Sequence, residues 1–214
     1  MYVPVTPAQP APALAPVAVF SAAPAAVPAP MHTTLRVGTS QLNVLADQGA
    51  TIAGALQEGR KGRPGRVVAL QELVGHGWRT LARTHTHAGG RFRLSFTAHR
   101  LGSERVRLRF AGDAYGRPAH RPLGRLSVYR LAGASWYGGG GGMACGGSLT
   151  SSTLGVANKT LPCGTLVTLR YNGRSIRVPV VDRGPYVAGR EFDLTEATKR
   201  ALGFGDTGNV WSTS

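Results

Sequence analysis

Residues 166–185 have the sequence LVTLRYNGRSIRVPVVDRGP and decide the fold of the C-terminal part of the chain. Apolar and polar residues alternate over 166–170 and over 175–181, which predicts two β-strands. Between them, Asn172-Gly173 is a strong signal for a two-residue hairpin turn, because both central residues of such a turn adopt positive φ. The stretch therefore predicts an antiparallel hairpin that ends in a Gly-Pro turn.

A short helix is predicted downstream of this hairpin. Thr195 can cap its first turn, and Glu196 there complements the positive end of the helix dipole. Lys199 and Arg200 suit its last turn, and Gly203 suits the C-terminal cap. Strands followed by one helix predict a small β-barrel domain, which we assign to residues 131–214.

Five motifs of this domain occur in an order that resembles a known family. They are ASWYG at 134–138, NKTLPCGT at 158–165, NGR at 172–174, VDRGP at 181–185 and FDL at 192–194. This pattern is similar to the rare lipoprotein A family of double-psi β-barrels, which is related more distantly to expansins and barwin. The resemblance covers about residues 133–205. It implies a six-stranded barrel in a secreted or surface protein that acts on peptidoglycan or another wall polysaccharide, in some members as a lytic transglycosylase.

Carboxylates are the only candidates for proton transfer in this domain. No histidine follows residue 130, so a Ser-His or Cys-His nucleophile and a histidine-ligated metal are excluded there. Asp182 ends an apolar strand and is expected at the barrel rim. Asp193 lies between two apolar residues, Phe192 and Leu194, which could withdraw its carboxyl from water. We therefore predict Asp193 and Asp182 as catalytic residues, and both match the two aspartates of the expansin groove.

The two aspartates are given different roles. Lytic transglycosylation, as the resemblance implies it, uses a hydroxyl of the sugar as nucleophile, so one carboxyl acting first as acid and then as base suffices. Ordinary glycoside hydrolysis needs two carboxylates at a defined separation. Asp193 is predicted as the acid, and Asp182 as the group that holds a sugar hydroxyl or steadies positive charge. Alternatively, Asp182 pairs with Arg183 or Arg190, and Asp193 accepts backbone N–H bonds at the helix start.

Aromatic residues are candidates for sugar binding, because their faces stack on apolar sugar faces. The predicted substrate-binding residues are Tyr186, Tyr137, Trp136 and Arg183. Tyr186 is expected to be exposed, whereas Trp136 is alternatively a core residue. Active family members usually carry a T-A-x-G-E stretch whose glutamate enters the groove, but residues 148–155 here contain no carboxylate. Two functions therefore stay open: cleavage of peptidoglycan, or non-catalytic, expansin-like binding and wall loosening.

The chain has two cysteines, Cys145 and Cys163. These are too few for a disulfide-dense scaffold or for a four-ligand zinc site. We predict one disulfide between them. Two buried free thiols are the alternative, because pairing needs an oxidising compartment.

A different β pattern precedes the barrel, over residues 37–130. Seven short segments separated by turn clusters, with no helical period, predict an immunoglobulin-like antiparallel β-sandwich. The sequence FAGDAY at 110–115 is similar to the F-x-G-D-x-x-Y pattern of bacterial surface modules of this kind. Alternation also predicts that certain arginines face water or a ligand; they are Arg91, Arg93, Arg105, Arg107 and Arg109.

The charge balance indicates a polyanionic partner. The chain has 25 basic and 10 acidic residues, a net charge of +15, and most of the excess precedes residue 131. We expect the five arginines to line one face that binds anionic wall polymer; a merely solvated face is the alternative. Nucleic acid is not expected, because interleaved stacking aromatics and a known module are missing. His85 and His87 lack further ligands, so neither a metal nor a cofactor is predicted.

Residues 1–36 are rich in proline and alanine. Proline removes backbone donors and clashes in helices, so this segment is predicted to be a disordered, semi-extended linker. No apolar run approaches the roughly 20 residues of a membrane helix, so no membrane span is expected. A secretory signal with a basic start is not evident in residues 1–30. The family resemblance nevertheless implies an exported, extracellular or wall-associated protein.

Overall fold

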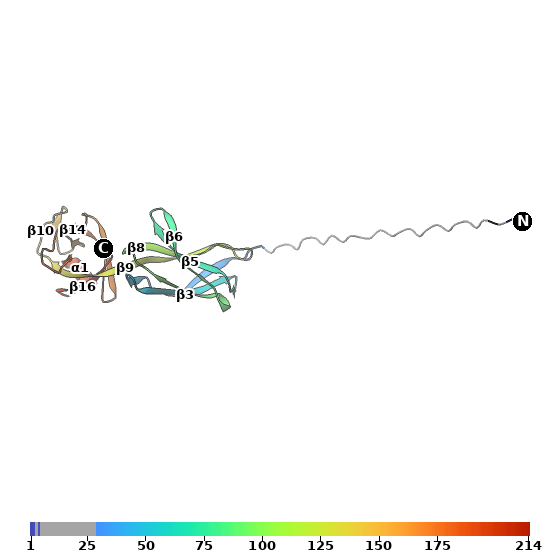
Figure 1. Cartoon of the computed structure of the whole chain (residues 1–214). Helices are drawn as coiled ribbons and strands as arrows, with labels where there is room; N and C mark the ends of the chain where they lie inside the picture. The colour runs from blue at the N-terminus through green and yellow to red at the C-terminus, as the bar shows by residue number, and fades with distance from the viewer. Residues whose placement is uncertain (3, 5–28) are drawn as a thin grey trace.

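The computed structural model describes residues 1–2, 4 and 29–214, which form two β units (Figure 1). An N-terminal β-sandwich is followed by a β-barrel that carries one short helix. The predicted mostly-β fold class is confirmed. Most of the predicted linker, residues 1–36, lies outside the described residues.

The sandwich is built from two sheets. In the first, β3 (Gly49–Glu58) is paired with β1 (Thr33–Ser40), β4 (Lys61–Gly62) and β7 (Arg91–Thr97). The second has the order β6 (Gly77–His85), β5 (Val67–Val74), β8 (Gly102–Phe110) and β9 (Ala119–Tyr137), with β2 (Asn43–Leu45) parallel to β9. A 3-10 turn, η1 (Ala88–Gly90), precedes β7. This strand order follows the immunoglobulin plan.

Alternation along the strands fills the sandwich core as predicted. On β7 the residues Phe92, Leu94 and Phe96 are buried between exposed neighbours, and on β8 Val106 and Leu108 are buried between exposed or half-buried arginines. These side chains join one apolar cluster between the sheets.

The arginines of β7 and β8 do not form the single face that we expected. Strand β7 belongs to one sheet and β8 to the other, and both strands turn their apolar residues toward the shared core. Arg91 and Arg93 therefore lie on the outer face of the first sheet. Arg105, Arg107 and Arg109 lie on the outer face of the second, on the opposite side of the sandwich. Alternation within a strand reports which residues share a face, but not which sheet the strand joins.

The first strand begins earlier than the predicted sandwich. Strand β1 starts at Thr33, inside the predicted linker, and its residues Thr33 and Leu35 are buried. The strand pairs antiparallel with β3 from Thr33 to Ser40. The linker boundary expected at residue 36 is therefore too late.

Strand β9 belongs to both units. Its first half, up to Val128, pairs with β8, and its second half, from Arg130 to Tyr137, pairs with strands of the barrel. The predicted boundary between residues 130 and 131 thus falls within one continuous strand. Two further contacts join the units here. The ring centroids of Tyr129 and Trp211 are 5.7 Å apart, and Arg130 donates two hydrogen bonds, of 2.9 and 2.6 Å, to the Glu191 carboxylate.

The barrel has six strands and closes on itself. Its order is β15 (Phe192–Thr195), β12 (Val156–Ala157), β14 (Arg174–Asp182), β13 (Leu166–Tyr171), β16 (Thr207–Ser212) and β9, and β15 pairs with β9 to complete the ring. The pairs β12–β14 and β15–β9 are parallel and the others antiparallel. A small hairpin joins β10 (Gly141–Gly142) to β11 (Ser148–Leu149).

Local signals of the barrel are confirmed. Strands β13 and β14 form the predicted hairpin around Asn172-Gly173, with Tyr171 opposite Arg174. The helix α1 (Glu196–Leu202) begins after Thr195, whose hydroxyl accepts a hydrogen bond from the Thr198 amide, and ends before Gly203 with φ of 65°. In the described part of the chain, no helix has the length and apolar character needed to cross a membrane.

Candidate functional site

One row of residues crosses four neighbouring barrel strands. Asp193 on β15 is opposite both Ser135 on β9 and Ala157 on β12, and Ala157 is in turn opposite Asp182 on β14. Neighbouring strands are about 4.8 Å apart, so the two aspartates are attached to backbones separated by about 10 Å. The closed barrel thus brings together the two carboxylates that the sequence singled out.

A β-bulge places both aspartates on the same face. Val156 is opposite the core residue Val180, but the next residue, Ala157, is opposite Asp182, so one residue is skipped on β14. Without this irregularity, Asp182 would follow Val180 toward the barrel core. The bulge instead aligns it with Asp193, away from the apolar interior.

Asp193 is held by a hydroxyl. The Ser135 hydroxyl donates a hydrogen bond to Oδ1 of the half-buried Asp193 carboxylate. Phe192 and Leu194 both belong to the barrel core and therefore project from the opposite face of β15. They do not form the apolar surroundings that we expected for the Asp193 carboxyl. Backbone capping at the helix start is provided by Thr195, not by Asp193.

Asp182 is held by backbone amides. Its Oδ1 accepts hydrogen bonds from the amides of Ala144 and Arg183, both of 2.8 Å. It makes no ion pair with Arg183, Arg190 or any other residue that the structure describes. The alternative in which an arginine neutralises Asp182 is therefore not the arrangement adopted.

A disulfide fixes the loop that supplies one of these amides. Cys145 and Cys163 are bonded, with their Cα atoms 5.5 Å apart, which confirms the predicted bridge. The amide of Cys145 also donates to the carbonyl of Val181, 3.2 Å away. The glycine-rich loop is thereby held against the end of β14, next to Asp182.

Tyr137 completes the cluster. It lies two residues after Ser135 and therefore on the same face of β9. Burial, followed by the negative charges of Asp182 and then Asp193, raises the pKa of Tyr137. Its buried hydroxyl lies beside Asp182, but this hydroxyl makes no hydrogen bond of good geometry with Asp182 or with any other described residue. The phenol therefore remains a neutral donor with a proton to offer. Sequence reasoning assigned Tyr137 only a stacking role.

Trp136 lies on the other face of β9, toward helix α1. Its indole N–H donates to Asp206 Oδ1 at 2.9 Å, and the Lys199 ammonium is 3.7 Å from the ring centroid. Lys199 also pairs with Asp206 at 2.8 Å, and these two donors lower the pKa of Asp206. The structure does not bring the Trp136 side chain together with Asp182 and Asp193, and one face of its ring is already occupied by Lys199.

Arg183 and Tyr186 differ in their availability to a ligand. Arg183 donates through one guanidinium nitrogen to the carbonyls of Asn158 and Leu161, at 3.0 and 2.9 Å, so it holds the loop after β12. Tyr186 is 80% exposed. It follows Gly184, whose φ of 125° only glycine adopts readily, in the turn after Arg183. Tyr186 is thus the predicted substrate-binding residue that presents a free ring.

Two participants of the site were missed from the sequence: the Ser135 hydroxyl and the Ala144 amide. For Ser135 a signal existed, because strand alternation over 134–137 sets it on one face with Tyr137. The Ala144 amide comes from a loop whose path depends on the disulfide. The described residues hold no group of three or more side chains suited to bind a metal. The arrangement supports proton transfer and hydrogen bonding to an oxygen-rich ligand.

Comparison with known proteins agrees with this geometry. Residues 131–211 match the family described as "Lytic transglycolase". A probable endolytic peptidoglycan transglycosylase RlpA of Aquifex aeolicus is 45% identical over 75 residues, which are 33% of this chain and 33% of that protein. The endolytic peptidoglycan transglycosylase RlpA of Pseudomonas aeruginosa is 38% identical over 95 residues, covering 42% of this chain and 28% of that protein. This chain thus spans a third or less of the length of these curated relatives.

Solved structures give weaker likenesses. The Streptomyces papain inhibitor aligns with 39% of this chain and 90% of its own, at 28% identity and a TM-score of 0.33. A fragment of intimin, solved with its translocated receptor, aligns with 81% of this chain and 62% of its own, at 11% identity and a TM-score of 0.35.

Proposed function

Since residues 131–211 form an RlpA-like double-psi β-barrel domain of the lytic transglycosylase family, we propose that this protein binds the glycan strands of peptidoglycan and cleaves them as a lytic transglycosylase. One observation carries the proposal. Asp182, Asp193 and Tyr137 come from three strands and meet on one face of the barrel. The matched relatives are named as peptidoglycan transglycosylases, which supports the same substrate class here.

In the proposed reaction, Asp193 transfers the proton. Its Oδ1 is occupied by the Ser135 hydroxyl, so Oδ2 is available to a substrate. The protonated carboxyl gives its proton to the oxygen of the glycosidic bond as that bond breaks. A hydroxyl of the same sugar then attacks the anomeric carbon and returns its proton to the carboxylate. No water enters, and the products are an anhydro-sugar end and a free hydroxyl end.

Asp182 and Tyr137 have supporting roles in this proposal. The Asp182 carboxylate, oriented by two amides, faces the positive charge that develops on the sugar ring. Opposite charges attract more strongly where water is partly excluded, so this contact stabilises the transition state. Tyr137 remains protonated and donates a hydrogen bond to a sugar oxygen. The exposed ring of Tyr186 stacks on a neighbouring sugar of the strand.

A second candidate function is glycan binding without cleavage. The observation that favours it is the segment 148–155, which has no carboxylate where active relatives of the family usually carry a glutamate. Its hydroxyl groups bond to one another instead: Thr150 contacts Ser152 and Thr153 at 3.0 and 2.9 Å. In this candidate the same barrel face loosens the wall by binding alone, as expansins do.

Incubation of the full chain with purified peptidoglycan distinguishes the candidates. Mass spectrometry of the released fragments should detect anhydro-sugar ends, which Asp193→Asn abolishes while leaving glycan binding and the melting temperature nearly unchanged. Asp182→Asn should weaken both binding and release. Asp206→Asn is the matched control, since that carboxylate lies on the side of Trp136.

Other products would contradict the transglycosylase. Reducing ends would indicate a hydrolase, and intact bound glycan would indicate a binding module. If the wild type releases nothing and Asp193→Asn mainly lowers the melting temperature, Asp193 is a structural residue. We also propose that the protein works outside the cytoplasm, which the disulfide supports, because such bonds persist in oxidising compartments.

A further inference from the structure

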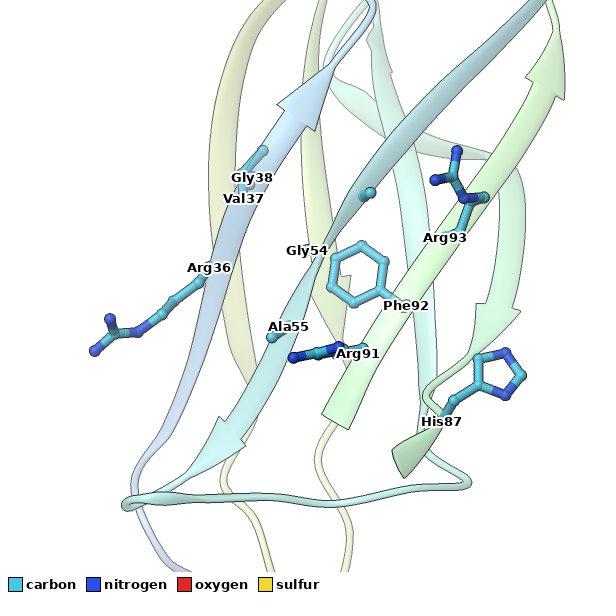
Figure 2. A pocket seen from close by; sticks show the side chains of 10 residues that line it. Arg36, Val37, Gly38, Gly54, Ala55, His87, Arg91, Phe92 and Arg93 are labelled. Atoms are coloured by element: carbon cyan, nitrogen blue, oxygen red, sulfur yellow. The ribbon is translucent and has the colours of Figure 1, made fainter. Parts of the chain in front are cut away.

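A groove runs along the outer face of the first sandwich sheet, over the central strand β3 (Figure 2). It has a volume of about 550 Å³ and is lined from β1, β3, β7 and the segment before β7. Its floor consists of small residues: Ala53, Gly54 and Ala55 on β3, with Gly38 beside them on β1. These residues leave an open channel between the longer side chains of the two flanking strands.

Three arginines flank this floor. Arg36 on β1 is opposite Ala55, which is in turn opposite Arg91 on β7, and Arg93 is opposite Ala53. Strand geometry sets Arg91 and Arg93 about 7 Å apart along β7, and Arg36 about 10 Å across β3 from Arg91. In Figure 2, Arg91 reaches toward Ala55 and His87 lies beside β7, whereas Arg36, on the opposite rim, extends outward from β1, away from β3. The groove therefore carries positive charge on both sides.

The acidic residues of the sandwich do not balance this charge. Arg36, Arg91 and Arg93 form no ion pair with any described residue. Four of the sandwich carboxylates make ion pairs with other basic residues: Glu58 with Arg63 and Arg66, Asp113 with Arg66, Glu72 with Arg79, and Asp47 with His99. The fifth, Glu104, lies on β8 of the other sheet. A ligand that enters the groove thus meets the guanidinium groups of Arg91 and Arg93, with that of Arg36 at the opposite rim, and no ion pair within the described residues compensates their charge.

We propose that this groove binds an extended polymer whose repeats carry phosphate groups, as anionic cell-wall polymers do. Guanidinium groups bind phosphate oxygens through paired hydrogen bonds, and their spacing along β7 presents successive donors to a repeating chain. The small floor lets the polymer backbone lie against the sheet. The wall compartment rests on the proposed function, but the site itself does not depend on glycan cleavage.

Titration of the full chain with soluble poly(glycerol phosphate) tests the site. The variant Arg36→Gln/Arg91→Gln/Arg93→Gln should bind at least about tenfold more weakly, since it removes the charged donors that pair with phosphate oxygens. The control variant Arg83→Gln/Arg105→Gln/Arg109→Gln removes the same charge from exposed positions of the other sheet. It should retain most of the affinity.

A second variant separates shape from charge. Ala53→Leu/Ala55→Leu fills the floor at constant net charge and should also weaken binding about tenfold, whereas circular dichroism should show a folded protein. Equal losses in the two arginine variants, no loss in the leucine variant, or no binding by the wild type would each overturn the proposal. Tighter, groove-dependent binding of single-stranded DNA would overturn it in favour of nucleic acid. Asp193→Asn should bind the polymer normally, so failure here is distinct from failure of the transglycosylase.

Discussion

Removal of the disulfide should lower the free energy of unfolding by about 3 kcal/mol. Cys145 and Cys163 are separated by 18 positions, and the bond denies the unfolded chain the conformations in which this loop is open. For a chain of this length each 1 kcal/mol shifts the melting temperature by roughly 2–4 °C, so a fall of roughly 6–12 °C follows. The variant is Cys145→Ser/Cys163→Ser, which leaves no free thiol.

Urea unfolding followed by tryptophan fluorescence measures this change. Cys163 is exposed and Cys145 half-buried, so serine at these positions should add little beyond loss of the bond. Wild type treated with a reductant is the control and should match the double variant, which the reductant should leave unchanged. Glycan binding should fall as well, because the disulfide holds the loop whose Ala144 amide contacts Asp182.

Two results would refute this reasoning. A loss below about 1 kcal/mol would mean that the loop is already restricted in the unfolded chain, so its closure contributes little. Full glycan binding by the double variant would mean that other contacts keep the Ala144 amide in place. The hydrogen bond from Cys145 to Val181 is the contact that would then explain it.

Two further changes test the barrel. The raised pKa of Tyr137 means that the folded protein holds the phenol proton more tightly than the unfolded chain does, so the contribution of this proton to stability is complete below about pH 10 and is lost as the pH rises further. Tyr137→Phe should therefore lose less stability than wild type between about pH 9 and 11. Parallel losses in the urea midpoints of the two proteins would contradict this. Thr195→Ala should lower the free energy of unfolding by roughly 1–3 kcal/mol, since it removes the helix cap and a buried hydrogen bond to the Gly155 carbonyl. Thr195→Ser keeps the hydroxyl and should therefore retain most of this stability. An unstable serine variant would assign the effect to the methyl group of Thr195.

Local features of this fold could be predicted from the sequence, and long-range ones could not. The Asn172-Gly173 hairpin and the helix after Thr195 depend on residues within a few positions of one another, so their signals are contained in short stretches. The membership of a strand in one sheet or the other depends on partners far along the chain. For this reason Arg91 and Arg105, which have the same local pattern, were wrongly assigned to one face.

The candidate site divides in the same way. Asp182 and Asp193 were found as carboxylates of a recognisable motif, and their juxtaposition required barrel closure through β15 and β9. The bulge beside Ala157, which sets Asp182 on the correct face, has no sequence signal of its own. The environment expected from Phe192 and Leu194 was wrong because adjacent residues of a strand point to opposite sides.

The continuity of strand β9 fixes the spacing between the sandwich and the barrel. A flexible linker would let the sandwich and the barrel sample many separations, whereas one hydrogen-bonded strand, reinforced by the pair of Arg130 and Glu191, sets a single separation. A force applied to the sandwich would be transmitted along the β9 backbone directly into the barrel wall, which this strand joins at Arg130. If one unit is anchored to a polymer, the other unit is therefore held at a fixed distance from that polymer, set by the length of this strand.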